Sequence, residues 1–169
     1  RVCGGQKTTL SVIDLAEFSK TVPSKLSAFS TATTKLIKGN DYKTVSDARA
    51  GTREFAVSSK IDQIDLVNFA NSIGTDEAKA LSEAVLGAVK YNRTSNSMTN
   101  AYGVSMYFPY KMASKVSTVA AINNDIGVDS EYNKCMQAFA GLETTGQVAA
   151  GGQGSAFGSL LGMGGTGSS

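Results

Sequence analysis

Apolar residues recur three and four positions apart along much of the chain, a spacing that places side chains on one face of an α-helix. The clearest run is Ala78, Leu81, Val85 and Val89. Thr75 stands just before this run, and a threonine hydroxyl there can accept a hydrogen bond from a free backbone N–H group of the first turn. The pattern therefore predicts a helix that begins after Thr75 and carries these apolar side chains on one face.

Two aspartates precede similar apolar runs and predict further helix starts. Asp14 has Glu17 three residues later, a pairing that can satisfy two free amides as a capping box does. Asp65 repeats the pattern, since Ile64–Phe69 resembles Ile13–Phe18 in sequence. The same capping chemistry arising twice explains this likeness better than an internal duplication.

Pro23 interrupts the first of these apolar runs. Because proline suits the first turn of a helix, we predict a second helical segment that begins near Pro23. Gly39-Asn40 would end this segment, since glycine commonly follows the last turn of a helix. Its buried face would consist of Leu26, Phe29 and Leu36.

The C-terminal third predicts one strand and two helices. Tyr102, Val104, Met106 and Phe108 alternate with Gly103, Ser105 and Tyr107. A period of two is typical of a strand, and Pro109 would end it because proline has no N–H group. We expect a helix around Ala113–Ile122, and Asp129 would cap a last one. The last helix carries Tyr132, Met136 and Phe139, with Gly141 near its end.

The 169 residues fit one folded domain followed by a tail. All predicted elements lie in residues 1–142, whereas residues 143–169 are rich in glycine and serine and have no charged residue after Glu143. This composition is typical of a flexible tail or linker, and we expect disorder beyond about residue 147. Four apolar side chains of this tail could still dock elsewhere: Val148, Phe157, Leu160 and Leu161.

Charge and hydropathy argue against two classes of partner. The 16 basic and 14 acidic residues are scattered and leave a net charge of +2, so no cluster would neutralise a row of phosphates and we expect no nucleic acid. No apolar run approaches the ~20 residues of a membrane-spanning helix. The chain opens at Arg1 without the apolar core of a signal peptide, which indicates a processed product or an excerpt of a longer precursor.

The chain contains no histidine, which removes the Cys-His dyad, the Ser-His-Asp triad and histidine metal sites. Its two thiols, Cys3 and Cys135, are interpreted as unrelated; a disulfide between them is the alternative in an oxidising compartment. Cys3 is a poor candidate for a nucleophile, because the nearby Arg1 and Lys7, which could lower its thiol pKa, belong to a terminus that we expect to be mobile.

Glu54, Asp62 and Asp65 could act together as acid and base, or as oxygen ligands of calcium. No twelve-residue calcium loop or fixed spacing supports either role, so we interpret them as helix caps and solvated surface positions. Asn92–Thr94 matches a glycosylation sequon, which matters only in a glycosylating host. The residues alone predict a mixed helix and strand domain without a self-contained active site.

Five segments carry a further signal. They are Thr9–Leu15, Thr52–Phe55, Asp62–Ala70, Asn100–Pro109 and Asp129–Tyr132, with Phe139–Gly141 after the last. In this order they resemble the C-terminal region of the clostripain family of cysteine peptidases, and they cover most of residues 8–142. The segment that ends in Pro109 is the most specific of them.

The resemblance implies an α/β fold, the helix-rich C-terminal part of a caspase-like peptidase, with a few strands adding to or flanking the catalytic sheet. The family's catalytic histidine and cysteine lie upstream of the matched region. No catalytic residue therefore carries over to this chain, and Cys3 does not take the role of the nucleophile. The whole enzyme would cleave protein or peptide substrates after Arg or Lys, with calcium as a possible cofactor, and would be secreted or attached to a bacterial cell surface.

The expected partner is the N-terminal catalytic portion of the same precursor. This chain would brace the catalytic sheet, with the strand at 104–108 as the favoured addition to it, and an isolated copy should expose the apolar face that meets the partner. The alternative is a non-catalytic binding or surface-display module built on the same architecture, which the glycine-rich tail would tether to another domain.

Overall fold

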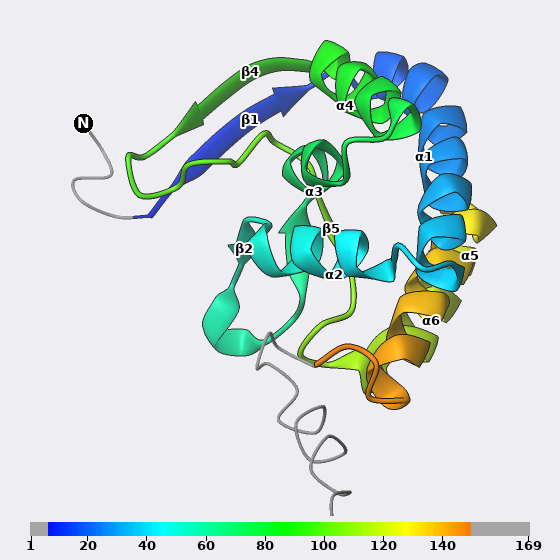
Figure 1. Cartoon of the computed structure of the whole chain (residues 1–169). Helices are drawn as coiled ribbons and strands as arrows, with labels where there is room; N and C mark the ends of the chain where they lie inside the picture. The colour runs from blue at the N-terminus through cyan, green and yellow to red at the C-terminus, as the bar shows by residue number, and fades with distance from the viewer. Residues whose placement is uncertain (1–6, 150–169) are drawn as a thin grey trace, which may run out of the picture.

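A computed structural model describes residues 7–149 of the chain (Figure 1). Its elements in chain order are β1 (Thr9–Ile13), α1 (Leu15–Lys38), α2 (Tyr42–Gly51), β2 (Glu54–Phe55), η1 (Val57–Ser59), β3 (Gln63–Asp65), α3 (Leu66–Ile73), α4 (Asp76–Ala88), β4 (Val89–Thr94), β5 (Ser105–Tyr107), η2 (Ala113–Lys115), α5 (Val116–Asp125) and α6 (Ser130–Thr144). The fold is mixed α/β and rich in helix, with small antiparallel sheets. The tail predicted to be disordered, from residue 150 on, lies outside the described residues, as does Cys3.

Helix α1 begins where Asp14 predicts it. The Asp14 carboxylate accepts a hydrogen bond from the Glu17 N–H at 3.0 Å. The second half of the predicted capping box is absent, because the Asp14 N–H donates to the Ala88 carbonyl at 2.8 Å instead. The Glu17 carboxylate pairs with Lys90 and so joins α1 to β4.

The second helical segment predicted at Pro23 is wrong, because α1 runs unbroken through Pro23 to Lys38. Pro23 is exposed, while Val22 and Leu26 on either side of it are buried. The buried apolar face is therefore continuous across the proline, and packing against α4 and α6 holds the helix despite the missing N–H group. The predicted end is confirmed, since the Gly39 N–H donates to carbonyls of the last turn.

Helices α3 and α4 follow one another closely, and each has the predicted cap. The Asp65 carboxylate accepts from the Asn68 N–H at 2.9 Å, and the Thr75 hydroxyl accepts from the Ala78 N–H at 3.2 Å. Val89, predicted on the helix face, instead begins β4.

The strand predicted at Tyr102–Phe108 is shorter than expected, since β5 covers only Ser105–Tyr107. Gly103 adopts a φ of +113°, which is outside the extended region, so the chain bends there. The Tyr102 N–H donates to the Asp65 carboxylate at 2.6 Å rather than to a neighbouring strand. Strands β2, β3 and β5 form one antiparallel sheet in that order.

Strands β1 and β4 form a second, two-stranded antiparallel sheet, which we call the ribbon. Neither strand was predicted from the sequence. A period of two was nonetheless present in both, since Leu10 and Val12 alternate with polar residues and Tyr91 follows Val89 by two positions. In Figure 1 the ribbon extends from the helices at one corner of the molecule.

The helix predicted around Ala113–Ile122 corresponds to η2 and α5, and Asp129 caps α6 as predicted, with its carboxylate accepting from the Glu131 N–H at 2.8 Å. Helix α6 continues past residue 142 to Thr144, and Val148 is buried in the core.

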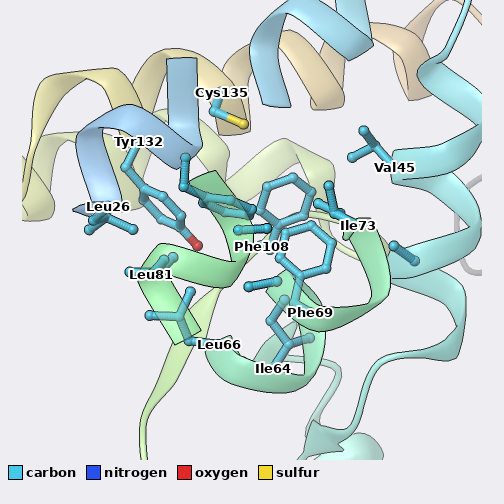
Figure 2. Packing of buried hydrophobic residues seen from close by; sticks show 14 of the residues in the cluster. Leu26, Val45, Ile64, Leu66, Phe69, Ile73, Leu81, Phe108, Tyr132 and Cys135 are labelled. Atoms are coloured by element: carbon cyan, nitrogen blue, oxygen red, sulfur yellow. The ribbon is translucent and has the colours of Figure 1, made fainter. Parts of the chain in front are cut away.

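The core is centred on Phe108, which lies just after β5 (Figure 2). Its ring centroid is 4.6 Å from that of Phe69 and 5.1 Å from that of Phe139, and Phe69 in turn meets Phe29 edge to face. These rings come from α1, α3 and α6, so one aromatic chain joins the helices to the sheet. The buried Tyr132 hydroxyl donates to the Tyr107 carbonyl at 2.7 Å and ties α6 to β5.

Candidate interaction surface and buried ion cluster

The ribbon has one exposed apolar face. In its register Leu10 lies opposite Arg93 and Val12 lies opposite Tyr91, and residues directly opposite each other in a sheet share a face. The exposed fractions are 62% for Leu10, 53% for Val12 and 46% for Tyr91. We call these three side chains the ribbon face.

The opposite face of the ribbon packs against the body of the molecule. Ser11 lies against Gly103, and the Asn92 side-chain amide donates to the Ala101 carbonyl at 2.8 Å. The Ser11 hydroxyl donates to the Asn92 side-chain oxygen at 2.8 Å. The ribbon is thus fixed by polar contacts on one side and leaves its apolar side uncovered by residues 7–149.

Two more exposed leucines lie where the ribbon joins the helices. Leu15 is the first residue of α1, two positions after the end of β1, and is 73% exposed; Leu86 lies in the last turn of α4, three positions before β4, and is 44% exposed. The ends of the two strands are held together by the hydrogen bond from Asp14 to Ala88. Single exposed leucines are ordinary, but five large apolar side chains on and beside one small sheet indicate an interaction surface.

The predicted acidic residues Glu54 and Asp62 meet at Arg49, a residue that the sequence analysis did not select. Arg49 is 1% exposed; its Nη2 lies 3.3 Å from a carboxylate oxygen of Asp62 and its Nη1 lies 3.5 Å from one of Glu54. Its Nε donates to the Phe108 carbonyl at 3.1 Å. The cluster therefore joins α2 to β2, to the residue before β3 and to the residue after β5.

The Asp62 carboxylate also holds a loop. It accepts hydrogen bonds from the backbone N–H groups of Tyr110, Lys111 and Met112 at 2.8–3.1 Å. Lys111 then reaches the Glu54 carboxylate with its Nζ at 2.9 Å. Three amides and a guanidinium thus surround the Asp62 carboxylate, whose side chain is completely buried.

The interpretation of these acids as solvated surface positions is wrong for Glu54 and Asp62, whose side chains are 10% and 0% exposed. It is right for Asp65 as a helix cap, although this carboxyl group is buried and its pKa is raised by that burial. The prediction failed because the ion pair joins residues from three segments, and local spacing contains no sign of such a contact.

Glu143 is a second acid that the sequence analysis missed. It lies near the end of α6, and among the described residues neither carboxylate oxygen has a hydrogen-bond partner, although both are shielded from solvent. Burial, with a smaller effect of the negative charge of Asp62, raises the pKa of Glu143 to about 7, against the opposing effect of Arg49. Glu143 therefore changes its charge near neutral pH.

Cys135 lies in α6 with its thiol in the core (Figure 2). Burial raises the pKa of this thiol to about 12, and a hydrogen bond with Thr34 offsets only part of the effect. Only the thiolate form of a cysteine is a good nucleophile, and the raised pKa keeps Cys135 in the thiol form near neutral pH. We therefore interpret Cys135 as a core residue. Its relation to Cys3 lies outside the described residues.

Two kinds of feature are absent from residues 7–149. Within this part of the chain, no group of three or more acidic, cysteine or histidine side chains is arranged to hold a metal ion. In the same residues, no helix combines the length and the apolarity needed to cross a membrane. The ion cluster is largely enclosed, whereas the ribbon face is open to a partner.

Comparisons of the chain with family models, curated proteins and solved structures find no match.

Proposed function

We propose that this chain is the structural C-terminal part of a clostripain-like cysteine endopeptidase that cleaves after Arg or Lys. The catalytic histidine and cysteine belong to another part of the same precursor, and this chain braces that part. Its contribution to catalysis is positional, because loops must hold the nucleophile and base at hydrogen-bond distance for the reaction to proceed.

The ribbon face is the observation that carries this proposal. Strand β1 lies in Thr9–Leu15, the first of the segments that resemble the family, and it places Leu10 and Val12 in solvent. Covering a large apolar side chain contributes about 1.5–3 kcal/mol. A domain that folded only for itself would gain this free energy by turning the face inward.

The position of the ribbon changes which strands best extend the catalytic sheet. The sequence favoured the strand at 104–108, but β5 belongs to the chain's own three-stranded sheet, where one of its edges pairs with β3. The ribbon has two strands and extends from the helices (Figure 1). Its apolar face is open, since Leu10, Val12 and Tyr91 are exposed. It is therefore the better candidate for contact with the catalytic part.

The test uses the complete precursor and a short reporter peptide with a single Arg or Lys. We expect cleavage after the basic residue, and at least about tenfold slower cleavage in the variant Leu10→Ser/Val12→Ser, because a loosened brace misplaces the catalytic groups. The matched control is Val57→Ser, which removes an apolar side chain that is 54% exposed but lies in η1. A folded precursor that fails to cleave any basic reporter would refute the proposal.

A non-catalytic binding or surface-display module is the second candidate function. The same ribbon face favours it, because an exposed apolar face serves a binding module equally well. The coding sequence upstream of Arg1 separates the two. A histidine followed by an Asp-x-Cys segment supports the peptidase, and an unrelated domain supports the module.

A further inference from the structure

An open groove lies between strands β3 and β5 on one side and helix α5 on the other. Its volume is about 490 Å³, and apolar side chains from both sides line it: Ile61, Met106, Val119, Ile122, Ile126 and Val128. Sites for small molecules typically have volumes of about 300–1,000 Å³ and mainly apolar walls. The groove therefore has the size and the lining of a small-molecule site.

Three isoleucines at this groove are exposed to solvent. The exposed fractions are 39% for Ile61, 52% for Ile122 and 70% for Ile126. Ile61 lies before β3, Ile122 lies in α5 and Ile126 follows that helix directly. An apolar chain placed between them would remove apolar surface of all three from water, which favours binding.

The walls of the groove are held in place by buried polar contacts. Ile61 directly precedes Asp62, whose carboxylate accepts hydrogen bonds from the N–H groups of residues 110–112. Tyr107 and Tyr132 both line the groove, and the Tyr132 hydroxyl donates to the Tyr107 carbonyl at 2.7 Å. The groove is thus formed before a ligand enters, so less affinity is lost to ordering of the protein.

One end of the ligand is specified by charge. Among the described residues that line the groove, Lys115 is the one that carries a charge, and its side chain is exposed. Within residues 7–149 the lysines in ion pairs are Lys79, Lys90, Lys111 and Lys134, so the Lys115 ammonium group is free to bind an anion. A single cation beside apolar walls is complementary to a molecule with one anionic group and an apolar chain.

We propose that this groove binds a fatty-acid carboxylate, with its apolar chain against Met106 and Ile122 and its carboxylate at the Lys115 ammonium group. The inference is independent of the peptidase proposal, because it concerns a different surface and a different ligand.

The test titrates the full chain with octanoate and with decanoate, both below their micelle concentrations, and follows binding by NMR. Each methylene group that is buried strengthens binding about fourfold. Decanoate should therefore bind at least about fivefold more tightly than octanoate. The shift changes should fall on Ser105–Tyr107 and on α5, which border the groove.

A charge reversal tests the role of Lys115. Lys115→Glu should weaken decanoate binding by at least about tenfold and make decyltrimethylammonium, which has the same chain and a cationic head, the preferred ligand. Lys79→Glu is the matched control, since it changes the net charge equally at an exposed position of α4, and it should leave both affinities unchanged.

Ile122→Ser tests the apolar wall and should weaken the binding of both amphiphiles by at least about fivefold, because both use the same chain contacts. Lys115 and Ile122 are exposed, so the fold of residues 7–149 is retained in these variants.

Three results would overturn the proposal. One is a set of shift changes confined to the ribbon face, which would mean that amphiphiles bind there instead. Another is equal affinity of the unaltered chain for decanoate and decyltrimethylammonium. The third is a concentration-dependent shift of the groove residues without any ligand, because a second copy of the chain would then fill the groove.

Discussion

At the scale of single residues, the buried Arg49 contacts two acidic side chains and the Phe108 carbonyl. Removing one partner of a buried ion pair leaves the other charge without compensation. Arg49→Met should therefore lower the free energy of unfolding by about 3–5 kcal/mol, because the Asp62 carboxylate stays fully buried. Urea denaturation measures the change.

Lys79→Met provides the control for this substitution. The ion pair of Lys79 with Asp76 is exposed, with exposed side-chain fractions of 65% and 98%, so the change in unfolding free energy should stay below about 1 kcal/mol. Equal effects of the two substitutions would mean that the Arg49 cluster contributes no more than a surface pair.

The raised pKa of Glu143 predicts how the free energy of unfolding depends on pH. Its pKa is raised from 4.5 to about 7 in the folded chain, so between these values the folded state binds a proton that the unfolded state has released. The contribution of Glu143 to the free energy of unfolding is fully present below about pH 4.5 and is lost as the pH rises through about 7. Because the Glu143 residue is partly exposed, the expected loss of unfolding free energy is only about 1 kcal/mol.

The measurement is a series of urea denaturations from pH 5 to pH 8 on the chain and on Glu143→Gln. The glutamine should abolish this component of the pH dependence, because it does not titrate. The chain has no histidine, so no imidazole contributes to the same range. Stability that rises over this interval in both proteins would contradict the assignment to Glu143.

At the scale of elements, Gly103 determines how the ribbon meets the body. A Cβ atom added there would lie 3.0 Å from the Ser11 hydroxyl oxygen, 3.2 Å from the Ser11 Cβ and 3.4 Å from a Val89 methyl carbon. The φ of +113° is also one that residues with a Cβ rarely adopt. Gly103→Ala should therefore lower the unfolding free energy by about 2 kcal/mol or more.

Gly51→Ala is the control, because no atom lies within 4 Å of the Cβ position in that helical glycine. Thermal unfolding compares the two variants, and Gly51→Ala should be neutral or slightly stabilising because alanine favours a helix. A Gly103→Ala chain as stable as Gly51→Ala would show that the ribbon does not depend on this close approach.

The elements also show which features a sequence can predict. Caps at Asp14, Asp65 and Thr75 were predicted because a cap and its helix lie within a few residues of each other. The break at Pro23 was predicted wrongly because packing of α1 against α4 and α6 outweighs the local preference of proline.

Long-range contacts had no local signal. Arg49, Asp62 and Glu143 come from α2, the loop before β3 and α6, and only the fold brings them together. The strands of the ribbon are separated by most of the helices, so the alternation within each strand did not reveal its partner. The ribbon face, which carries the proposed function, therefore required the structure.

At the scale of the whole molecule, the chain has a well-packed interior and an incompletely covered exterior. The aromatic chain around Phe108 and the Arg49 cluster fix the body. The ribbon extends from that body with Leu10, Val12 and Tyr91 in solvent. An isolated copy therefore has a surface that gains free energy from any apolar contact, including contact with a second copy.

The last prediction follows from this asymmetry. The isolated chain should self-associate at micromolar concentration through the ribbon face, and Leu10→Ser/Val12→Ser should weaken the association by at least about tenfold, since each lost apolar contact contributes 1 kcal/mol or more. Val57→Ser should leave it unchanged, because this residue lies in η1 and not on the ribbon. Sedimentation equilibrium measures all three. A chain that stays monomeric at every concentration, without binding an apolar dye, would show that the ribbon face needs no partner, and the proposed brace would lose its physical basis.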